Sequence, residues 1–196
     1  PLIVFEDADI ESAANGIIAG NFGASGQSCV AGSRVIVHKN IAQELIKLIE
    51  KKSQSIVVGD PLNPETNLGP LCTVKQIHLI EETLKKSIEQ GGEIIFGGKK
   101  IEQDGNYFEP TLIHCPNRQI ETLKVEMFGP VISIIEFDSE EEAIEISNDS
   151  KYGLGSGLFT KDLARAHRVS QEIKAGICWV NTYRVISPIA AFGGFN

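Results

Sequence analysis

The sequence contains no long apolar stretch and no excess of basic residues. No run approaches the roughly 18 apolar residues that a membrane-spanning helix needs. Among 196 residues, 18 Lys and Arg stand against 26 Asp and Glu, so the net charge is −8. Nucleic acids and anionic membranes bind basic surfaces. We therefore expect neither a nucleic acid nor a membrane as a partner.

Cysteine and histidine are also sparse. The sequence has four of each, with no Cys-x-x-Cys pair and no two His four residues apart. This spacing argues against a zinc site and against thioredoxin-type chemistry, so we expect no bound metal. An acidic protein whose thiols stay reduced is typical of the cytoplasm.

The usual phosphate-binding motifs are missing as well. The sequence has no P-loop, no G-x-S-x-G elbow and no G-x-G-x-x-G between a strand and a helix. Gly153, Gly155 and Gly157 have the right spacing, but they fall at the start of an expected strand. These residues therefore do not predict a dinucleotide fingerprint.

The segments that are present alternate between helix and strand. Amphipathic stripes predict helices over about 9–22, 40–49, 73–90, 140–149 and 162–174. Short β-rich runs predict strands at 34–38, 93–96, 107–114, 130–137, 156–160 and 176–181. This alternation favours an α/β fold of three layers, a mainly parallel twisted sheet with helices on both faces. No linker divides residues 1–196, because the segments beside the Gly- and Pro-rich loop 57–70 are too short to fold alone.

Local signals refine this pattern. Asn40 with Gln43 has the form of a capping box, and Thr73 and Ser139 are expected to cap the helices that follow them. In parallel sheets, ligands bind beyond the carboxyl ends of strands. We therefore expect a site in the loops after Phe137, Thr160 and Asn181, with the Asn181 side chain bonded to a neighbouring loop.

Cys29 lies in a Gly-rich connection between a helix and a strand. Flanking glycines allow unusual turns and leave room for a substrate to approach the sulfur. The local pattern allows a nucleophile, but a lone cysteine in such a pattern is more often a small apolar side chain that fills a turn. Cys72, Cys115 and Cys178 are interpreted as structural, with Cys178 in the core.

Glu126 and Phe128 precede the most apolar strand. A carboxylate there could accept hydrogen bonds from sugar hydroxyls, and Phe128 could offer a flat face to a ring. The pattern alone also fits a solvated Glu and a core Phe. Phe192 lies in a final Gly-rich turn with the same ambiguity.

Several blocks together resemble the catalytic domain of the NAD(P)-dependent aldehyde dehydrogenase superfamily. The resemblance runs in order over all 196 residues, and it is specific because of the joint order and spacing of the blocks, each of which is modest alone. The blocks are PLIVFEDADIESA, NFGASGQSCVAGSRVIV, GDPLNPETNLGPL, GNYFEPTLI, EMFGPVISI, SNDSKYGLGSGLFTKD, GICWVNTY and AFGGF.

The resemblance implies roles for individual residues. Cys29 would attack an aldehyde to give a thiohemiacetal, and its backbone N–H would stabilise the oxyanion. Glu126 would hold the nicotinamide ribose of NAD or NADP, and Phe128 would press on the nicotinamide. The small-molecule aldehyde would lie in a tunnel lined by Phe22, Ser28, Val30, Ile186 and Phe192.

The resemblance also implies that parts of the family's active site are not among these residues. The family's general-base glutamate would precede Pro1, and a separate cofactor-binding domain would carry a second oxyanion donor. Because the sequence opens at Pro1 and stops in the turn FGGFN, we expect an isolated catalytic domain that does not turn over. The family also implies a homo-oligomer.

Three alternatives remain open from the sequence. Coenzyme A rather than water could release the acyl group from Cys29. The domain could be non-enzymatic and keep only the fold, although Cys29, Glu126, Phe128 and Asn181 together argue against that. The thiol could also act as a weak esterase. The small residues Ser28 and Val30 leave room for a medium-sized or aromatic aldehyde.

Overall fold

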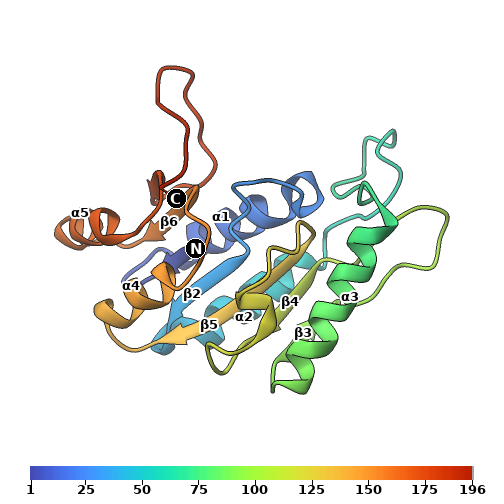
Figure 1. Ribbon diagram of the computed structural model, residues 1–196. Helices are drawn as coiled ribbons and strands as arrows, with labels where there is room; N and C mark the ends of the chain where they lie inside the picture. Colours follow the sequence, from blue (N-terminus) through green and yellow to red (C-terminus); the bar gives the residue numbers. More distant parts are fainter. Residues whose placement is uncertain (196) are drawn as a thin grey trace.

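A seven-stranded sheet runs through the middle of the computed structural model, which describes residues 1–195, and helices cover both of its faces (Figure 1). The strand order is β3-β4-β5-β2-β1-β6-β7. Every neighbouring pair is parallel except β3 with β4, which is antiparallel at one edge. This architecture confirms the predicted three-layer α/β fold.

The strands are β1 (Leu2–Val4), β2 (Arg34–His38), β3 (Glu93–Phe96), β4 (Thr111–His114), β5 (Val131–Phe137), β6 (Gly155–Phe159) and β7 (Ile177–Val180). The helices are α1 (Ile10–Phe22), α2 (Lys39–Ser53), α3 (Val74–Glu89), α4 (Glu140–Asn148) and α5 (Leu163–Glu172), with short 3-10 turns η1 (Gly23–Gly26) and η2 (Glu121–Leu123). No helix within residues 1–195 combines the length and the apolar character needed to cross a membrane.

Strand β1, which local sequence patterns do not predict, lies near the centre of the sheet. It pairs with β2 on one side and with β6 on the other. Leu2 and Val4 pack in the core beneath α1 and α2, whereas Ile3 packs in the core beneath α3, α4 and α5. All three side chains are fully buried. A strand of three residues shows no periodicity, so its sequence carries little signal.

The strand β5 fits its prediction closely. A near-continuous apolar run is typical of a strand that is buried on both faces, and six of the seven residues of β5 are buried. Alternate side chains enter the two cores, since Ile132 and Ile134 face α1 and α2 while Val131 and Ile135 face the other helices. The apolar side chains of β5 therefore pack against both layers of helices, one layer on each face of the sheet.

Helix α2 begins earlier than predicted. Its N-cap is His38, whose Nδ1 accepts a hydrogen bond from the backbone N–H of Asn40 at 3.3 Å. The predicted Asn40–Gln43 capping box is therefore wrong, because β2 runs directly into the helix and leaves Asn40 within its first turn. The predicted caps at Thr73 and Ser139 are confirmed, each accepting from the backbone N–H three residues later.

The predicted strand 107–114 is also shorter than expected. Only Thr111–His114 pairs in the sheet, and Phe108 forms an isolated bridge to Lys100. Pro110 lies between these two segments and has no N–H to donate to a ladder. The proline therefore separates β4 from the residues that precede it.

A set of hydrogen bonds closes the carboxyl edge of the sheet. The Asp7 carboxylate, just after β1, accepts from Thr160 Oγ1 at 2.9 Å, from the backbone N–H of Lys161 and Asp162, and from Arg165 Nη1 at 3.0 Å. The Asn181 side chain bonds both the N–H and the carbonyl of Thr160 at 2.9 Å, as predicted. These contacts join the ends of β1, β6 and β7.

Asp7→Asn is expected to lower the free energy of unfolding by about 2 kcal/mol at pH 7, because charged hydrogen bonds become neutral ones. Burial disfavours the Asp7 carboxylate, but its bonds with Thr160, Lys161 and Asp162, together with the charge of Arg165, outweigh burial and lower its pKa. Asp7 therefore stabilises the fold above the ordinary Asp pKa, and this contribution disappears as the pH falls through the lower folded-state pKa.

The measurement is urea unfolding of wild type and Asp7→Asn between about pH 3 and pH 8. The stability difference should be constant at neutral pH and shrink below about pH 4. Asp104→Asn, in an exposed loop, is the matched control and should leave stability unchanged. A difference for Asp7→Asn that does not depend on pH would contradict the expected role of the charge.

Candidate active site around Cys29

Cys29 lies at the tip of a tight turn between η1 and β2. The backbone N–H of Ala31 donates to the carbonyl of Ser28 at 2.9 Å, which closes the turn over Cys29 and Val30. Cys29 is exposed, whereas Val30 is only 4% exposed and contacts the Gly155 region. The buried neighbour therefore anchors the turn while the thiol stays accessible.

An unusual backbone precedes the turn. Ala24, Ser25 and Gly26 have φ values of 55°, 54° and 72°, so three successive residues are left-handed. This conformation is unfavourable for Ala and Ser, and it persists only where surrounding contacts hold it. One such contact is the hydrogen bond from Ser25 Oγ to the carbonyl of Gly69 at 2.9 Å.

A second hydrogen bond joins the Cys29 loop to the same neighbouring segment. Gln27 Oε1 accepts from the backbone N–H of Cys72 at 2.9 Å. Ser25 and Gln27 thus bind both ends of the segment 69–72, which leads into α3. Two side chains of the cysteine loop thus bind backbone groups of residues that lie more than forty positions away in the sequence.

Gly26 brings the Glu126–Pro130 region against the cysteine loop. A Cβ at Gly26 would lie 2.0 Å from the carbonyl oxygen of Gly129, so only glycine fits there. Phe128, next to Gly129, has a φ of 46°, again left-handed. The close backbone contact therefore places the predicted residues Glu126 and Phe128 on a segment adjacent to the Cys29 loop.

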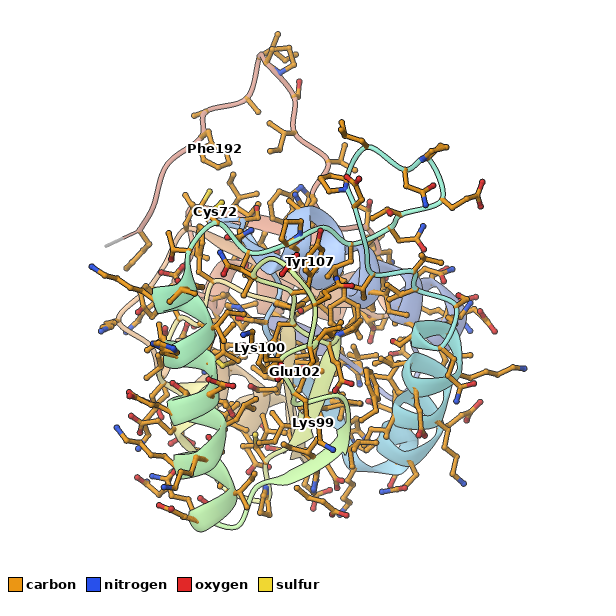
Figure 2. All side chains as sticks on the ribbon, turned by 90° about the vertical axis from the view of Figure 1, so that its right-hand side faces the viewer. Cys72, Lys99, Lys100, Glu102, Tyr107 and Phe192 are labelled. Atoms are coloured by element: carbon orange, nitrogen blue, oxygen red, sulfur yellow. The ribbon has the colours of Figure 1, made fainter. Side chains whose placement is uncertain are left out.

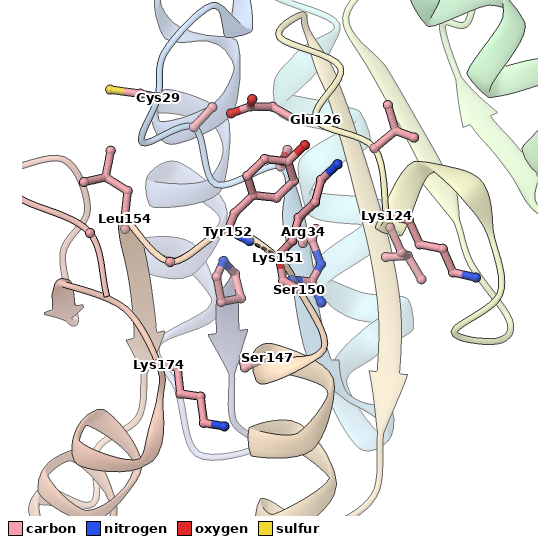
Figure 3. A pocket seen from close by; sticks show the side chains of 18 residues that line it. Cys29, Arg34, Lys124, Glu126, Ser147, Ser150, Lys151, Tyr152, Leu154 and Lys174 are labelled. Atoms are coloured by element: carbon pink, nitrogen blue, oxygen red, sulfur yellow. Dashed lines mark hydrogen bonds between the residues drawn. The ribbon is translucent and has the colours of Figure 1, made fainter. Parts of the chain in front are cut away.

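Cys29 and Glu126 line one cavity of about 330 Å³. Figure 3 shows both side chains at its upper rim, with Tyr152 and Arg34 below them. Arg34 Nη2 donates to the carbonyl of Ile146, and burial lowers the pKa of Arg34 while the Asp149 charge opposes the shift. Local sequence patterns do not predict Tyr152 as a site residue, although it belongs to the block SNDSKYGLGSGLFTKD.

The cavity lies at the edge opposite to the expected one. Pro1, Ser33 and Leu154 line it and immediately precede β1, β2 and β6. It is therefore at the amino ends of these strands, and Cys29 and Glu126 do not lie in the expected loops after Phe137, Thr160 and Asn181. The reason is topological: α1 returns the chain to the amino edge, so any residue between α1 and β2 lies there.

The structure brings only some of the predicted tunnel residues close to the cysteine. Ser28 and Val30 flank it in the turn. Phe22 is buried against the α1 layer and lines a different cavity, of about 590 Å³, between α1 and the loop after α2. Ile186 and Phe192 are exposed on the extended segment after β7, where Figure 2 shows Phe192 beyond the body of the molecule.

The other three cysteines differ in accessibility. Cys115 is buried, and burial raises its pKa to about 11. Cys178 is partly buried against a core cluster, which also raises its pKa. Cys72 is exposed, contrary to the interpretation of this thiol as structural (Figure 2). The chain therefore has two accessible thiols, and only Cys29 lines the cavity described above.

Among residues 1–195, no three His, Cys, Asp or Glu side chains gather in a way that could hold a metal ion. Several chemically distinct side chains line the cavity that contains Cys29. They comprise an accessible thiol, a carboxylate at the rim of the same cavity, and an aromatic and a cationic side chain below them.

Comparisons with known proteins find several similar dehydrogenases. A dehydrogenase of Acinetobacter baylyi, named (Z)-2-((N-methylformamido)methylene)-5-hydroxybutyrolactone dehydrogenase, is 46% identical over the whole chain. A betaine aldehyde dehydrogenase of Cereibacter sphaeroides is 40% identical over 99% of the chain. The chain spans about 40% of the length of each.

Solved structures match equally well. The crystal structure of PnpE in complex with nicotinamide adenine dinucleotide has a TM-score of 0.95 and 43% identity, covering 98% of this chain and 40% of that one. Betaine aldehyde dehydrogenase from Staphylococcus aureus in complex with NAD⁺ also gives 0.95, at 33% identity, covering 99% of this chain and 39% of that one.

The sequence model described as the aldehyde dehydrogenase family matches residues 1–196. With a thiol at the tip of a strained Gly-rich turn and a seven-stranded sheet that superimposes on these dehydrogenases, the chain belongs to the aldehyde dehydrogenase family.

Proposed function

We propose that these residues form the nucleophile-bearing domain of an enzyme that oxidises small aldehydes to carboxylic acids. One observation carries the proposal: Cys29 is exposed at the tip of a turn and shares a cavity with the Glu126 carboxylate. A domain that kept only the fold would not need a strained backbone to present a thiol.

The chemistry of Cys29 follows from this position. Its thiolate adds to the aldehyde carbon, which forms an S–C bond and moves the carbonyl electron pair onto oxygen. The Cys29 N–H has no acceptor among residues 1–195, so it is free to donate to that oxyanion. After loss of hydride, the thioester reacts with water, and the C–S bond breaks to release the acid and regenerate the thiol.

Glu126 and Phe128 fit a nicotinamide cofactor. The Glu126 carboxylate is exposed at the cavity rim and able to accept hydrogen bonds from ribose hydroxyls. Phe128 is 38% exposed and leaves a ring face accessible. When bound, NAD⁺ or NADP⁺ accepts the hydride. Structures of relatives contain NAD, which supports NAD as the cofactor here.

The remaining assignments belong to the same proposal. The cofactor-binding domain and the general-base glutamate lie outside residues 1–196, and Ser28 and Val30, which flank Cys29 in the turn, border the path of the aldehyde to the thiol. Relatives named for betaine aldehyde and for a hydroxybutyrolactone support a small polar substrate. We place the enzyme in the cytoplasm, as a homo-oligomer.

Cys29→Ala in the full-length protein should reduce aldehyde oxidation by about 10³-fold or more, because no other group replaces the nucleophile. The assay measures NADH or NADPH formation with a panel of aldehydes and both cofactors. Cys72→Ala is the matched control, since it removes the other exposed thiol, and it should retain full activity. Equal activity of wild type and Cys29→Ala would refute the proposal.

The 196-residue chain should bind NAD more weakly than about 1 mM, or about −4 kcal/mol. Only Glu126 and Phe128 are proposed to contact the cofactor, at its nicotinamide end, so most of the binding free energy is missing. Titration calorimetry measures the affinity. A micromolar dissociation constant would show that these residues contain a complete cofactor site.

The chain should associate into dimers or larger species. Apolar side chains are strongly exposed after β7, among them Ile186 at 59%, Ile189 at 96% and Phe195 at 61%. Such patches favour association despite a net charge of −8. Light scattering should give a mass above that of one 21.3 kDa chain.

Ile189→Lys should shift this mass toward a single chain. Leu62→Lys is the matched control, because Leu62 is 88% exposed in the loop between α2 and α3. The mass of one chain for the wild type at high protein concentration would rule out association through this segment.

A further inference from the structure

We propose that Tyr183 is a positioning residue that fixes the Cys29 loop at both of its ends. The inference rests on the proposed role of Cys29 as nucleophile. Tyr183 follows β7 and is distant in sequence from the loop, yet its ring lies against both the end of α1 and the start of β2.

Three glycines create the space for this ring. A Cβ would lie 2.5 Å from the Tyr183 ring at Gly20, 2.7 Å at Gly157 and 3.2 Å at Gly32. Gly20 belongs to α1, Gly157 to β6, and Gly32 follows Cys29 by three residues. The ring therefore occupies a slot that a side chain at Gly20 or Gly157 would fill and that one at Gly32 would narrow.

This slot includes both ends of the cysteine loop. The loop leaves α1 after Phe22 and enters β2 at Arg34, so Gly20 and Gly32 flank it. Between them, the loop is held by the Gly26 contact with Gly129 and by the hydrogen bonds of Ser25 and Gln27. The Tyr183 ring adds a rigid contact that fixes the separation of the two ends.

The residues around Tyr183 hold the ring in place. Its ring packs edge-on against Trp179 with centroids 4.9 Å apart, and Trp179 Nε1 donates to the carbonyl of Val185 at 2.7 Å. Arg184 Nη1 donates to the carbonyl of Ala19 in α1 at 3.2 Å. Asn181 and Arg184 have positive φ values, which turn the chain back toward the sheet.

The ring rather than the hydroxyl makes these contacts. The Tyr183 hydroxyl is buried and has no hydrogen-bond partner within residues 1–195. Burial is also the main reason that the pKa of this phenol is raised, so the side chain is neutral. Tyr183→Phe therefore keeps the contacts that matter, whereas Tyr183→Leu removes the flat ring from the slot.

The test measures alkylation by iodoacetamide of the two exposed thiols in one sample. Peptide mapping gives the rate at Cys29 relative to that at Cys72, which serves as an internal reference. Tyr183→Leu should lower this ratio by about five-fold or more, because small displacements of a reacting group have large effects on rate. Tyr183→Phe should stay within about two-fold of wild type.

Two further variants separate positioning from general destabilisation. Gly32→Ala keeps the ring but pushes on it from the loop side, and it should lower the ratio in the same direction if Tyr183→Leu fails to fold. Phe137→Leu removes a buried ring from the other core and should leave the ratio unchanged. In the full-length enzyme, Tyr183→Leu should lower kcat by about ten-fold with the cofactor KM unchanged, and Tyr183→Phe should restore kcat.

The outcomes distinguish the two proposals. The proposed function itself would be refuted if Cys29 of the wild type did not react and the full-length enzyme were inactive. A reactive Cys29 whose ratio is the same in wild type and in folded Tyr183→Leu would overturn the positioning role alone. A ratio that falls equally in Tyr183→Phe, or in Phe137→Leu, would also overturn it.

Discussion

The contact between the backbones of Gly26 and Gly129 is the constraint on which the candidate site depends. The two segments that carry Cys29 and Glu126 are about a hundred residues apart in sequence, and no covalent or ionic bond joins them at this point. They meet because Gly26 has no side chain, since a Cβ there would overlap the Gly129 carbonyl. The left-handed conformation of Gly26 allows the same approach. Any other residue would separate the thiol from the carboxylate.

The sequence predicts the fold well where long, periodic segments specify it. Strand β5 and helix α3 closely match the predicted ranges, because an apolar run and a capped amphipathic stripe are each compatible with few other secondary structures. Strand β1 escapes prediction because three residues are too few to show a period, and the start of α2 because His38 is an unusual cap. For the site, residue types and family blocks indicate Cys29 and Glu126. Local patterns do not indicate which edge of the sheet carries these two residues, or that Tyr152 lies with them in the cavity wall. Both depend on chain topology, which local patterns do not contain.

The two edges of the sheet are stabilised by different means. At the carboxyl edge, Asp7, Arg165 and Glu140 form a network of charged groups, and the Arg165 guanidinium also lies 4.6 Å from the centroid of the Phe5 ring. At the amino edge, the cysteine loop is held by glycine contacts and by single neutral hydrogen bonds. Charged groups therefore stabilise the carboxyl edge, whereas the conformation of the loop that carries Cys29 depends on close packing and on neutral hydrogen bonds.

The ring contact beside Tyr183 also gives the molecule an optical property. Trp179 is the only tryptophan in the sequence, and it packs directly on Tyr183. Its indole is largely buried, so its emission depends on the packing of this one corner rather than on an average over the protein. Because the same corner borders the loop that carries Cys29, intrinsic fluorescence reports on the surroundings of the thiol without any added label.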